Sequence, residues 1–186
     1  MINNDVLRSV RYMLDINDAK IVEITGLAGH TIEKADVIAY LKKEAVVVEA
    51  VAEEESAEEG IEEGAEEGAE KAIEKTVPEE GYLPCPDEVL AYFLDGLVIF
   101  KRGKNDNLPA HPIDLPVTNN MVLKKLRVAF ELKEDDLHAI LKAAEFPVSK
   151  PELSALFRKF GHSNYRTCGD QLLRNFLKGL TLRIRG

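Results

Sequence analysis

The sequence repeats itself, and this internal repeat limits the fold more than any other feature of the chain. Residues 2–43 align without a gap to residues 118–159 at an offset of 116, with ten identities. Residues 85–103 align to residues 168–186 at an offset of 83, with nine identities. Repeats of this length indicate two copies of one structural unit. Because the offsets of 116 and 83 differ by 33, the first copy carries 33 additional residues between its aligned blocks.

Apolar residues recur in both copies with the spacing of one face of an α-helix. An asparagine precedes the first apolar run of each copy, Asn4 or Asn120, where its side chain can cap free backbone amides. Further helices are predicted at residues 18–27, 33–44 and 86–102 in the first copy and at 134–144, 150–160 and 168–184 in the second. The predicted fold is therefore all-α, with roughly four helices in each copy, packed about a pseudo-twofold axis.

The predicted organisation places the first copy at residues 1–103, a linker at 104–117 and the second copy at 118–186. The additional residues form an acidic insertion at 45–80, which holds 14 glutamates and only two lysines. This insertion carries a charge of −12, whereas the rest of the chain carries +3. Because its glutamates repel one another and its glycines recur, we expect it to be flexible or marginally helical. Two roles stay open, a dispensable loop and an acidic segment that occupies a basic surface or binds a partner.

A glycine interrupts the apolar run of the last helix in both copies, in FLDGL at Phe93–Leu97 and in FLKGL at Phe176–Leu180. Glycine inside a helix costs about 1 kcal/mol relative to alanine. Absence of a side chain lets another backbone approach closely. We therefore predict that the two long helices cross near Gly96 and Gly179, around the pseudo-twofold axis.

Two arginines, Arg11 and Arg127, occupy equivalent positions at the border of the first apolar run. An arginine in such a place favours a carboxylate partner. The aspartates that recur at the start of the last helix are Asp87 and Asp170, so we predict Arg–Asp ion pairs that tie the first helix to the last. Pairing within a copy and pairing between copies both stay open. The expected role is structural, with a ligand site as the alternative.

Two cysteines, Cys85 and Cys168, also fall at the start of the last helix of each copy. Backbone amides and the helix dipole can lower a thiol pKa there, which would suit redox sensing. A half-buried structural cysteine is the common alternative, and we favour it because no histidine accompanies both cysteines at equivalent positions.

Sequence motifs for catalysis and metal binding are absent. The chain contains no GxGxxG, GxxxxGK[ST], GxSxG, CxxC or HExxH. We therefore predict no catalytic residues, no metal and no cofactor. The absence of these motifs favours a protein that is not an enzyme, without deciding the question.

Basic residues recur near the predicted helix ends and permit contacts with nucleic-acid phosphates. The residues concerned are Arg8, Lys124, Lys125, Lys101, Arg102, Arg158 and Lys159. An ordinary solvated face is the alternative, because the rest of the chain is only mildly basic. The third helix of the second copy also offers apolar residues where base-reading polar ones would be needed.

Four motifs follow one another in an order that resembles the bacterial YehS-like family, a group of proteins of unknown function. They are NNDVLRSVRYML, CPDEVLAYFLDGLVIFKRGK, NNMVLKKLRVAF and CGDQLLRNFLKGL. The resemblance covers nearly all of the chain outside residues 45–80. It implies a compact cytoplasmic bacterial protein with duplicated helical units, and it brings no catalytic residues. The acidic insertion is a departure from the family's usual length.

The predicted function is non-enzymatic binding of a protein partner, in a groove between the two copies. The alternative is a nucleic-acid-binding regulator that uses the basic helix ends, and a small-molecule enzyme comes third. The chain has no apolar run of 18 residues, and its N-terminus lacks the basic and apolar segments of a signal peptide. We therefore expect a cytoplasmic protein that does not bind membranes.

Overall fold

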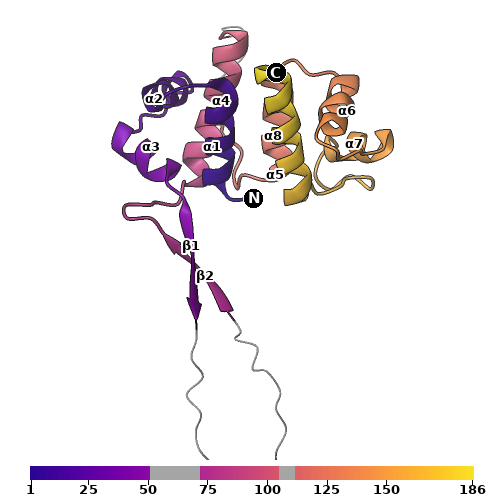
Figure 1. Ribbon diagram of the computed structural model, residues 1–186. Coiled ribbons are helices and arrows are strands. Elements are labelled where there is room, and N and C mark those ends of the chain that lie inside the picture. Colours follow the sequence, from indigo (N-terminus) through magenta and orange to yellow (C-terminus); the bar gives the residue numbers. More distant parts are fainter. Residues whose placement is uncertain (51–71, 105–111) are drawn as a thin grey trace, which may run out of the picture. The chain divides into compact units, whose positions relative to one another are not determined.

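A computed structural model describes residues 1–50, 72–104 and 112–186 of the chain, which form eight helices and two strands (Figure 1). The helices are α1 (Asn3–Leu14), α2 (Asp18–Leu27), α3 (Lys34–Leu41), α4 (Asp87–Arg102), α5 (Asn119–Ala129), α6 (Glu134–Ala143), α7 (Lys150–Leu156) and α8 (Asp170–Arg185). The strands are β1 (Glu44–Ala50) and β2 (Ala72–Pro78). The chain divides into a helical unit, Met1–Leu41 with Leu83–Gly186, and a second compact unit, Lys42–Tyr82.

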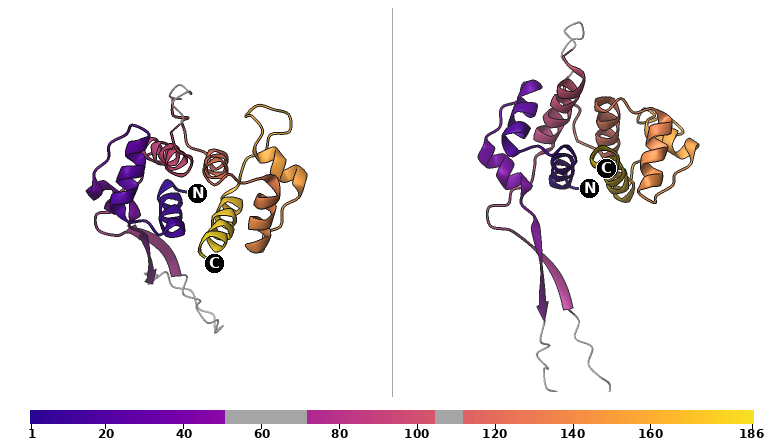
Figure 2. Two further views of the ribbon diagram at one scale, coloured as in Figure 1. Left: turned by 90° about the horizontal axis from the view of Figure 1, so that it is seen from above. Right: turned by 45° about the horizontal axis from the view of Figure 1, so that its top comes forward.

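The helical unit confirms the predicted duplication. Helices α1 to α4 form the first copy and α5 to α8 the second, so each copy has the four predicted helices. Helix α4 packs against α5, and α1 packs in the equivalent way against α8. The first helix of each copy therefore packs against the last helix of the other copy, about a pseudo-twofold axis. Figures 1 and 2 show these four helices in the middle, with α2 and α3 on one side and α6 and α7 on the other.

The core of the helical unit repeats between the copies as well. Leu7 and its counterpart Leu123 are fully buried, and so are Phe93 and Phe176. All four belong to one continuous apolar cluster. Burying one such side chain contributes about 1.5–3 kcal/mol. The periodic apolar residues of the central helices are therefore what joins the two copies into one unit.

The glycines of α4 and α8 lie at close helix crossings, but the predicted partner is wrong. A Cβ atom added at Gly96 would lie 1.8 Å from the carbonyl oxygen of Ile24, which belongs to α2. A Cβ added at Gly179 would lie 2.1 Å from the carbonyl oxygen of Ile140, which belongs to α6. Each long helix thus crosses the second helix of its own copy at its glycine. The sequence places a glycine on a helix face, but it does not say which helix meets that face.

Two ion pairs between the copies follow the pseudo-twofold axis. Arg102 of α4 lies 3.2 Å from Glu131, and Arg185 of α8 lies 3.4 Å from Asp15. The repeat offsets of 83 and 116 convert one pair into the other. Asp15 and Glu131 both follow a first helix and share a φ of 53°. Exposed ion pairs contribute only about 0–1 kcal/mol, so these pairs reflect the symmetry rather than cause it.

The unit Lys42–Tyr82 contains an antiparallel hairpin, which corrects part of the prediction for the acidic insertion 45–80. Strand β1 pairs with β2 in a register that runs from Glu44 opposite Pro78 to Ala50 opposite Ala72. Over both strands the insertion is therefore extended and not helical. The three successive valines of β1 explain the difference, because β-branched residues favour strands. The glycine-rich part of the insertion, and most of the predicted linker 104–117, lie outside the described residues.

Candidate functional site

One buried asparagine in each copy joins three segments of the chain. In the first copy, Nδ2 of Asn4 donates to the carbonyls of Tyr40 (3.0 Å) and Leu83 (2.8 Å). Its Oδ1 accepts a hydrogen bond from the backbone N–H of Cys85 at 2.9 Å. Asn4 is only 2% exposed, and these three bonds compensate the burial of its amide. The predicted capping of its own helix is therefore wrong, since the amide that Asn4 caps belongs to the segment before α4.

Asn120 does the same in the second copy. Its Nδ2 donates to the carbonyls of Leu156 and Arg166, both at 2.9 Å, and its Oδ1 accepts from the backbone N–H of Cys168 at 2.8 Å. In both copies, the asparagine holds the point where the chain leaves the third helix and the point where it returns towards the fourth. The hairpin unit of the first copy and the loop 157–165 of the second are therefore inserted at equivalent positions of the repeat.

The aspartates at the start of α4 and α8 each accept a hydrogen bond from an asparagine side chain and one from a main-chain nitrogen. Asp87 accepts hydrogen bonds from Nδ2 of Asn3 (2.7 Å) and from the backbone N–H of Val117 (3.0 Å). Asp170 accepts from Nδ2 of Asn119 (2.7 Å) and from the N-terminal amino group. The hydrogen bond from that amino group, followed by the one from Asn119, lowers the pKa of Asp170. Both aspartates thus fix the start of a first helix.

The arginines predicted to pair with these aspartates have other partners, so the predicted Arg–Asp pairs are wrong. Nε of Arg11 donates to Asp18 at 3.1 Å, within the same copy. Arg127 donates to the carbonyl of Leu132 at 3.2 Å and lies 4.6 Å above the ring of Phe157. The reason is distance along the helix. Arg11 follows the first-turn asparagine that binds Asp87 by eight residues, which is about 12 Å in an α-helix.

Cys85 and Cys168 are buried free thiols, 5% and 2% exposed. Burial, and then the nearby Asp87, raise the pKa of Cys85 to about 12. Burial and Asp170 likewise raise the pKa of Cys168 to about 11. Desolvation therefore outweighs the helix-start effect, and both groups stay protonated at neutral pH. These surroundings favour the structural role.

The cations predicted to bind phosphate differ in the contacts that they already make within the protein. Arg8, Lys125 and Arg102 each form an ion pair with a carboxylate. Lys101 lies with its Nζ 5.2 Å from the ring centre of Phe130. Lys124, Arg158 and Lys159 are exposed to solvent. The nucleic-acid contacts predicted along the helix ends stay a prediction, and Arg158 and Lys159 lie where the structure adds further suitable groups.

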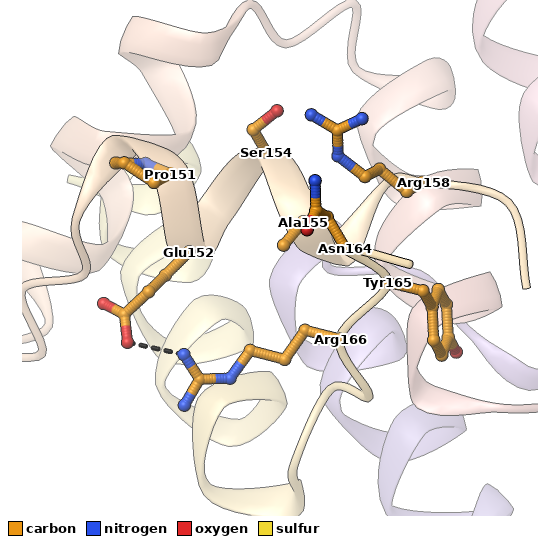
Figure 3. A pocket seen from close by; sticks show the side chains of 8 residues that line it. All are labelled: Pro151, Glu152, Ser154, Ala155, Arg158, Asn164, Tyr165 and Arg166. Carbon is orange, nitrogen blue, oxygen red and sulfur yellow. Dashed lines mark hydrogen bonds and ion pairs between the residues drawn. The ribbon is translucent and has the colours of Figure 1, made fainter. Parts of the chain in front are cut away.

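A groove lies between α7 and the loop that follows it, with a volume of about 550 Å³ (Figure 3). We call it the α7 groove. Its lining residues are Pro151, Glu152, Ser154, Ala155, Arg158, Asn164, Tyr165 and Arg166. Ser149 starts α7 with a capping box to Glu152, so the side of the groove that α7 forms is well defined.

The two arginines of the α7 groove have different surroundings. Arg166 donates to Oε1 of Glu152 at 2.6 Å. Hydrogen bonds from the Ser149 side chain, and next from Arg166, lower the pKa of Glu152 and keep it ionised. Arg158 has no carboxylate partner among the described residues, and its nearest polar contact is Nε2 of His162 at 3.5 Å. Because Nδ1 of His162 accepts from Asn164, the proton of the neutral ring lies on Nε2 and faces Arg158.

An aromatic pair, one ring of which is exposed, lies at the α7 groove. Phe160 is 85% exposed, and its ring meets that of Tyr165 edge to face, with 5.5 Å between the ring centres. Sequence reasoning singled out Arg158 and Lys159 here, but it missed Phe160, Tyr165 and Arg166. The signal available was the alternation of basic and aromatic residues in FRKFGHSNYR.

A second groove, of about 380 Å³, is formed by residues 15–23 of the first copy. Each of these two grooves lies within a single copy, so neither is the predicted groove between the copies. Among the described residues, no group of three or more His, Cys, Asp or Glu side chains is arranged to hold a metal ion. No helix in the described part of the chain has the length and apolar character to cross a membrane.

Comparison with known proteins gives one family and one relative. Residues 3–59 and 119–186 match the family described as "Protein of unknown function (DUF1456)". The "Uncharacterized protein YehS" of Escherichia coli (strain K12) is 40% identical over 183 residues, which is 98% of this chain and 96% of that protein. No solved structure matches the chain. The two family matches begin at Asn3 and Asn119, which the repeat aligns, and the resemblance to the YehS-like family is confirmed.

Proposed function

This chain belongs to the DUF1456 family, and we propose that it acts in the cytoplasm as a non-enzymatic module that binds a protein partner. The partner adds an extended segment to the hairpin of β1 and β2. The observation that supports this proposal is the two-stranded sheet itself. Among the described residues, β1 and β2 pair only with each other, so each strand is an edge strand.

An edge strand is a template for a further strand. Its outer row of backbone N–H and C=O groups has no partner within the sheet, and many proteins bind extended peptides there by strand addition. Each strand of the hairpin spans seven residues, which is long enough to pair with a peptide segment. A two-stranded hairpin alone is marginally stable in water, so a third strand would stabilise it.

Charge decides the chemistry of the partner. The insertion at residues 45–80 carries −12, and the two strands themselves hold Glu44, Glu49 and Glu74. A second copy of the same hairpin would be repelled, whereas a basic extended segment would be attracted. The proposed partner is therefore a protein with an exposed basic segment that can adopt a strand.

The test uses the full chain and a replacement variant. In the variant, eight glycine and serine residues replace residues 42–82, so that they and Leu41 match the nine residues 157–165 that span the equivalent place in the second copy. The probe is a fluorescent eight-residue peptide of alternating lysine and valine. Its control is the same peptide with every backbone nitrogen methylated, which keeps the charge but cannot pair with a strand.

Fluorescence anisotropy should show that the unmodified peptide binds the full chain at least tenfold more tightly than the methylated one. The replacement variant should bind neither peptide. Equal binding of both peptides to the full chain would reduce the hairpin to a non-specific acidic surface and contradict strand addition. Absence of binding to the full chain at 50 mM salt would contradict the proposal as well.

Nucleic-acid binding is the second candidate. The ion pairs of Arg8, Lys125 and Arg102 weaken it along the helix ends. The basic and aromatic residues beside the α7 groove favour it.

A further inference from the structure

We propose that the α7 groove, together with Phe160, is a binding site for single-stranded nucleic acid. The site lies wholly in the second copy, so it is independent of the hairpin and goes beyond the protein-binding function proposed above. Four properties of the described residues support it: the charge of the second copy, the state of the two arginines, the exposed aromatic ring and the fixed conformation of the loop.

The charge of the chain is distributed unevenly between the copies. Residues 118–186 contain 13 Lys and Arg against seven Asp and Glu, which gives a net charge of +6. The segment 150–166 contains four of these cations and a single acidic residue, Glu152. A polyanion is therefore attracted to the second copy, and most directly to α7 and the loop that follows it.

The two arginines supply donors for phosphate groups. Arg158 lacks a carboxylate partner within the described residues, and the N–H of His162 faces it, so an anion is the partner that this guanidinium lacks. Arg166 uses one nitrogen to bind Glu152, and this bond fixes the side chain while its other N–H groups stay available. In Figure 3 the two guanidinium groups lie apart from each other, so each can bind a different phosphate of one strand.

The aromatic pair supplies a surface for bases. A phenylalanine that is 85% exposed gains nothing from burial in the fold, but its faces can stack on an unpaired base. Tyr165, which is half-buried, contacts the Phe160 ring in an edge-to-face arrangement. Stacking requires bases that are free of a duplex, so this residue favours a single strand over double-stranded nucleic acid.

The loop is fixed before any ligand binds. The backbone N–H of Arg166 donates to the carbonyl of Ala155 at 3.2 Å, which ties the end of the loop to α7. Within the loop, the N–H of Tyr165 donates to the carbonyl of His162 at 2.8 Å. A site that is ordered in advance loses less entropy on binding. The expected ligand is a short single strand that is recognised by backbone charge and stacking, with little dependence on base sequence.

The test measures the fluorescence anisotropy of labelled oligonucleotides with the full chain at 50 mM and 200 mM salt. The probes are a 12-nucleotide oligothymidine, an abasic strand of the same length, and a 12-base-pair duplex. Stacking on an aromatic side chain strengthens binding by about 5- to 140-fold per base. Oligothymidine should therefore bind more tightly than the abasic strand by a factor in this range, and the duplex should bind more weakly than oligothymidine.

Two variants test which residue contributes base stacking and which contributes phosphate binding. Phe160→Ala should reduce oligothymidine affinity to that of the abasic strand, with unchanged thermal unfolding because the ring is exposed. Arg158→Gln should weaken both strands alike and reduce the salt slope by about 0.7. Lys124→Gln is the matched control, because it removes the same charge from an exposed position on α5, outside the groove.

Several results would overturn the proposal. They are an abasic strand that binds as tightly as oligothymidine, a Phe160→Ala variant with unchanged affinity, and equal losses from Arg158→Gln and Lys124→Gln. Absence of oligothymidine binding at 50 mM salt would overturn it too. A 12-residue polyglutamate that competes as well as oligothymidine would assign the groove to an acidic protein segment instead.

Discussion

Replacing Gly96 by alanine tests the packing of the helical unit most sharply, because local and tertiary effects have opposite signs. Alanine is the better helix former by about 1 kcal/mol, so propensity alone predicts a gain in stability. In the structure, the new Cβ would lie 1.8 Å from the carbonyl oxygen of Ile24 and 2.7 Å from its carbonyl carbon. Real Cβ contacts do not fall below 3.0 Å, so α2 must move away by about 1.2 Å.

The expected loss of stability depends on which atom the new Cβ would overlap. Overpacking usually costs about 1–3 kcal/mol, and a backbone oxygen cannot rotate away, so we take the upper value of about 3 kcal/mol. After the propensity gain, the net destabilisation is about 2 kcal/mol. For a chain of this length, that lowers the melting temperature by about 4–8 °C.

Gly26 provides the matched control for this experiment. It lies in α2, inside a helix like Gly96, but a Cβ added there would meet no atom within 4 Å. Gly26→Ala should therefore raise the melting temperature by about 2–4 °C. Calorimetry or circular dichroism measures both shifts. A Gly96→Ala variant as stable as the wild-type chain, or one that shifts in the same direction as Gly26→Ala, would refute the close approach of α2 and α4.

Three further predictions concern the polar groups at the helix starts. Asn4→Ala leaves two buried carbonyls and the N–H of Cys85 unpaired, so urea titration should show a loss of about 3 kcal/mol or more. The control Asn175→Ala removes a single exposed hydrogen bond and should cost less than about 0.5 kcal/mol. Because burial raises the pKa of Cys85 to about 12 and of Cys168 to about 11, iodoacetamide at pH 8 should label both thiols at least tenfold more slowly in the folded protein than in urea, and equal rates would contradict this. The pKa of Asp170 is lowered on folding, so its stabilisation is present above the ordinary pKa of 3.8 and is lost as the pH falls below it. Asp170→Asn should therefore unfold with a weaker acid dependence than the wild-type chain between pH 4 and about 2 in thermal scans, and an unchanged acid dependence would count against the bond to the amino terminus.

The fold could be predicted from the sequence wherever regular spacing decides the structure. The apolar residues of α1 and α5 recur at helical intervals, and a helix with one apolar face must bury that face. The sequence match between the two copies also predicted that they pack about a pseudo-twofold axis. Spacing does not say which helix covers which face, and for that reason Gly96 and Gly179 were assigned to the wrong crossing.

Polar contacts between distant segments were harder to predict. Asn4 looks like a helix cap, because caps are the commonest role of an asparagine at that position. Its real partners lie 36, 79 and 81 residues further along the chain, and only the folded structure brings them together. The same limit applies to Asp87, which a nearby asparagine reaches and the more distant Arg11 does not.

The two candidate sites were each predictable from the sequence only in part. Arg158 and Lys159 were visible as basic residues, but the value of Phe160 depends on its exposure, which sequence alone does not give. The hairpin was obscured by the composition of the acidic insertion around it. Its valines favour a strand, but the glutamate and glycine repeat dominated the interpretation of the segment.

The two proposed sites are surfaces inserted at equivalent positions of one repeat, each with its own ligand. The direct measurement compares the full chain with two replacement variants, one with eight glycine and serine residues in place of 42–82 and one with nine in place of 157–165. Both variants are checked for helix content by circular dichroism and then titrated with the lysine–valine peptide and with oligothymidine. We expect the first replacement to abolish peptide binding alone and the second to abolish oligothymidine binding alone. If each folded variant lost both ligands, or neither ligand, the result would contradict two separate binding sites.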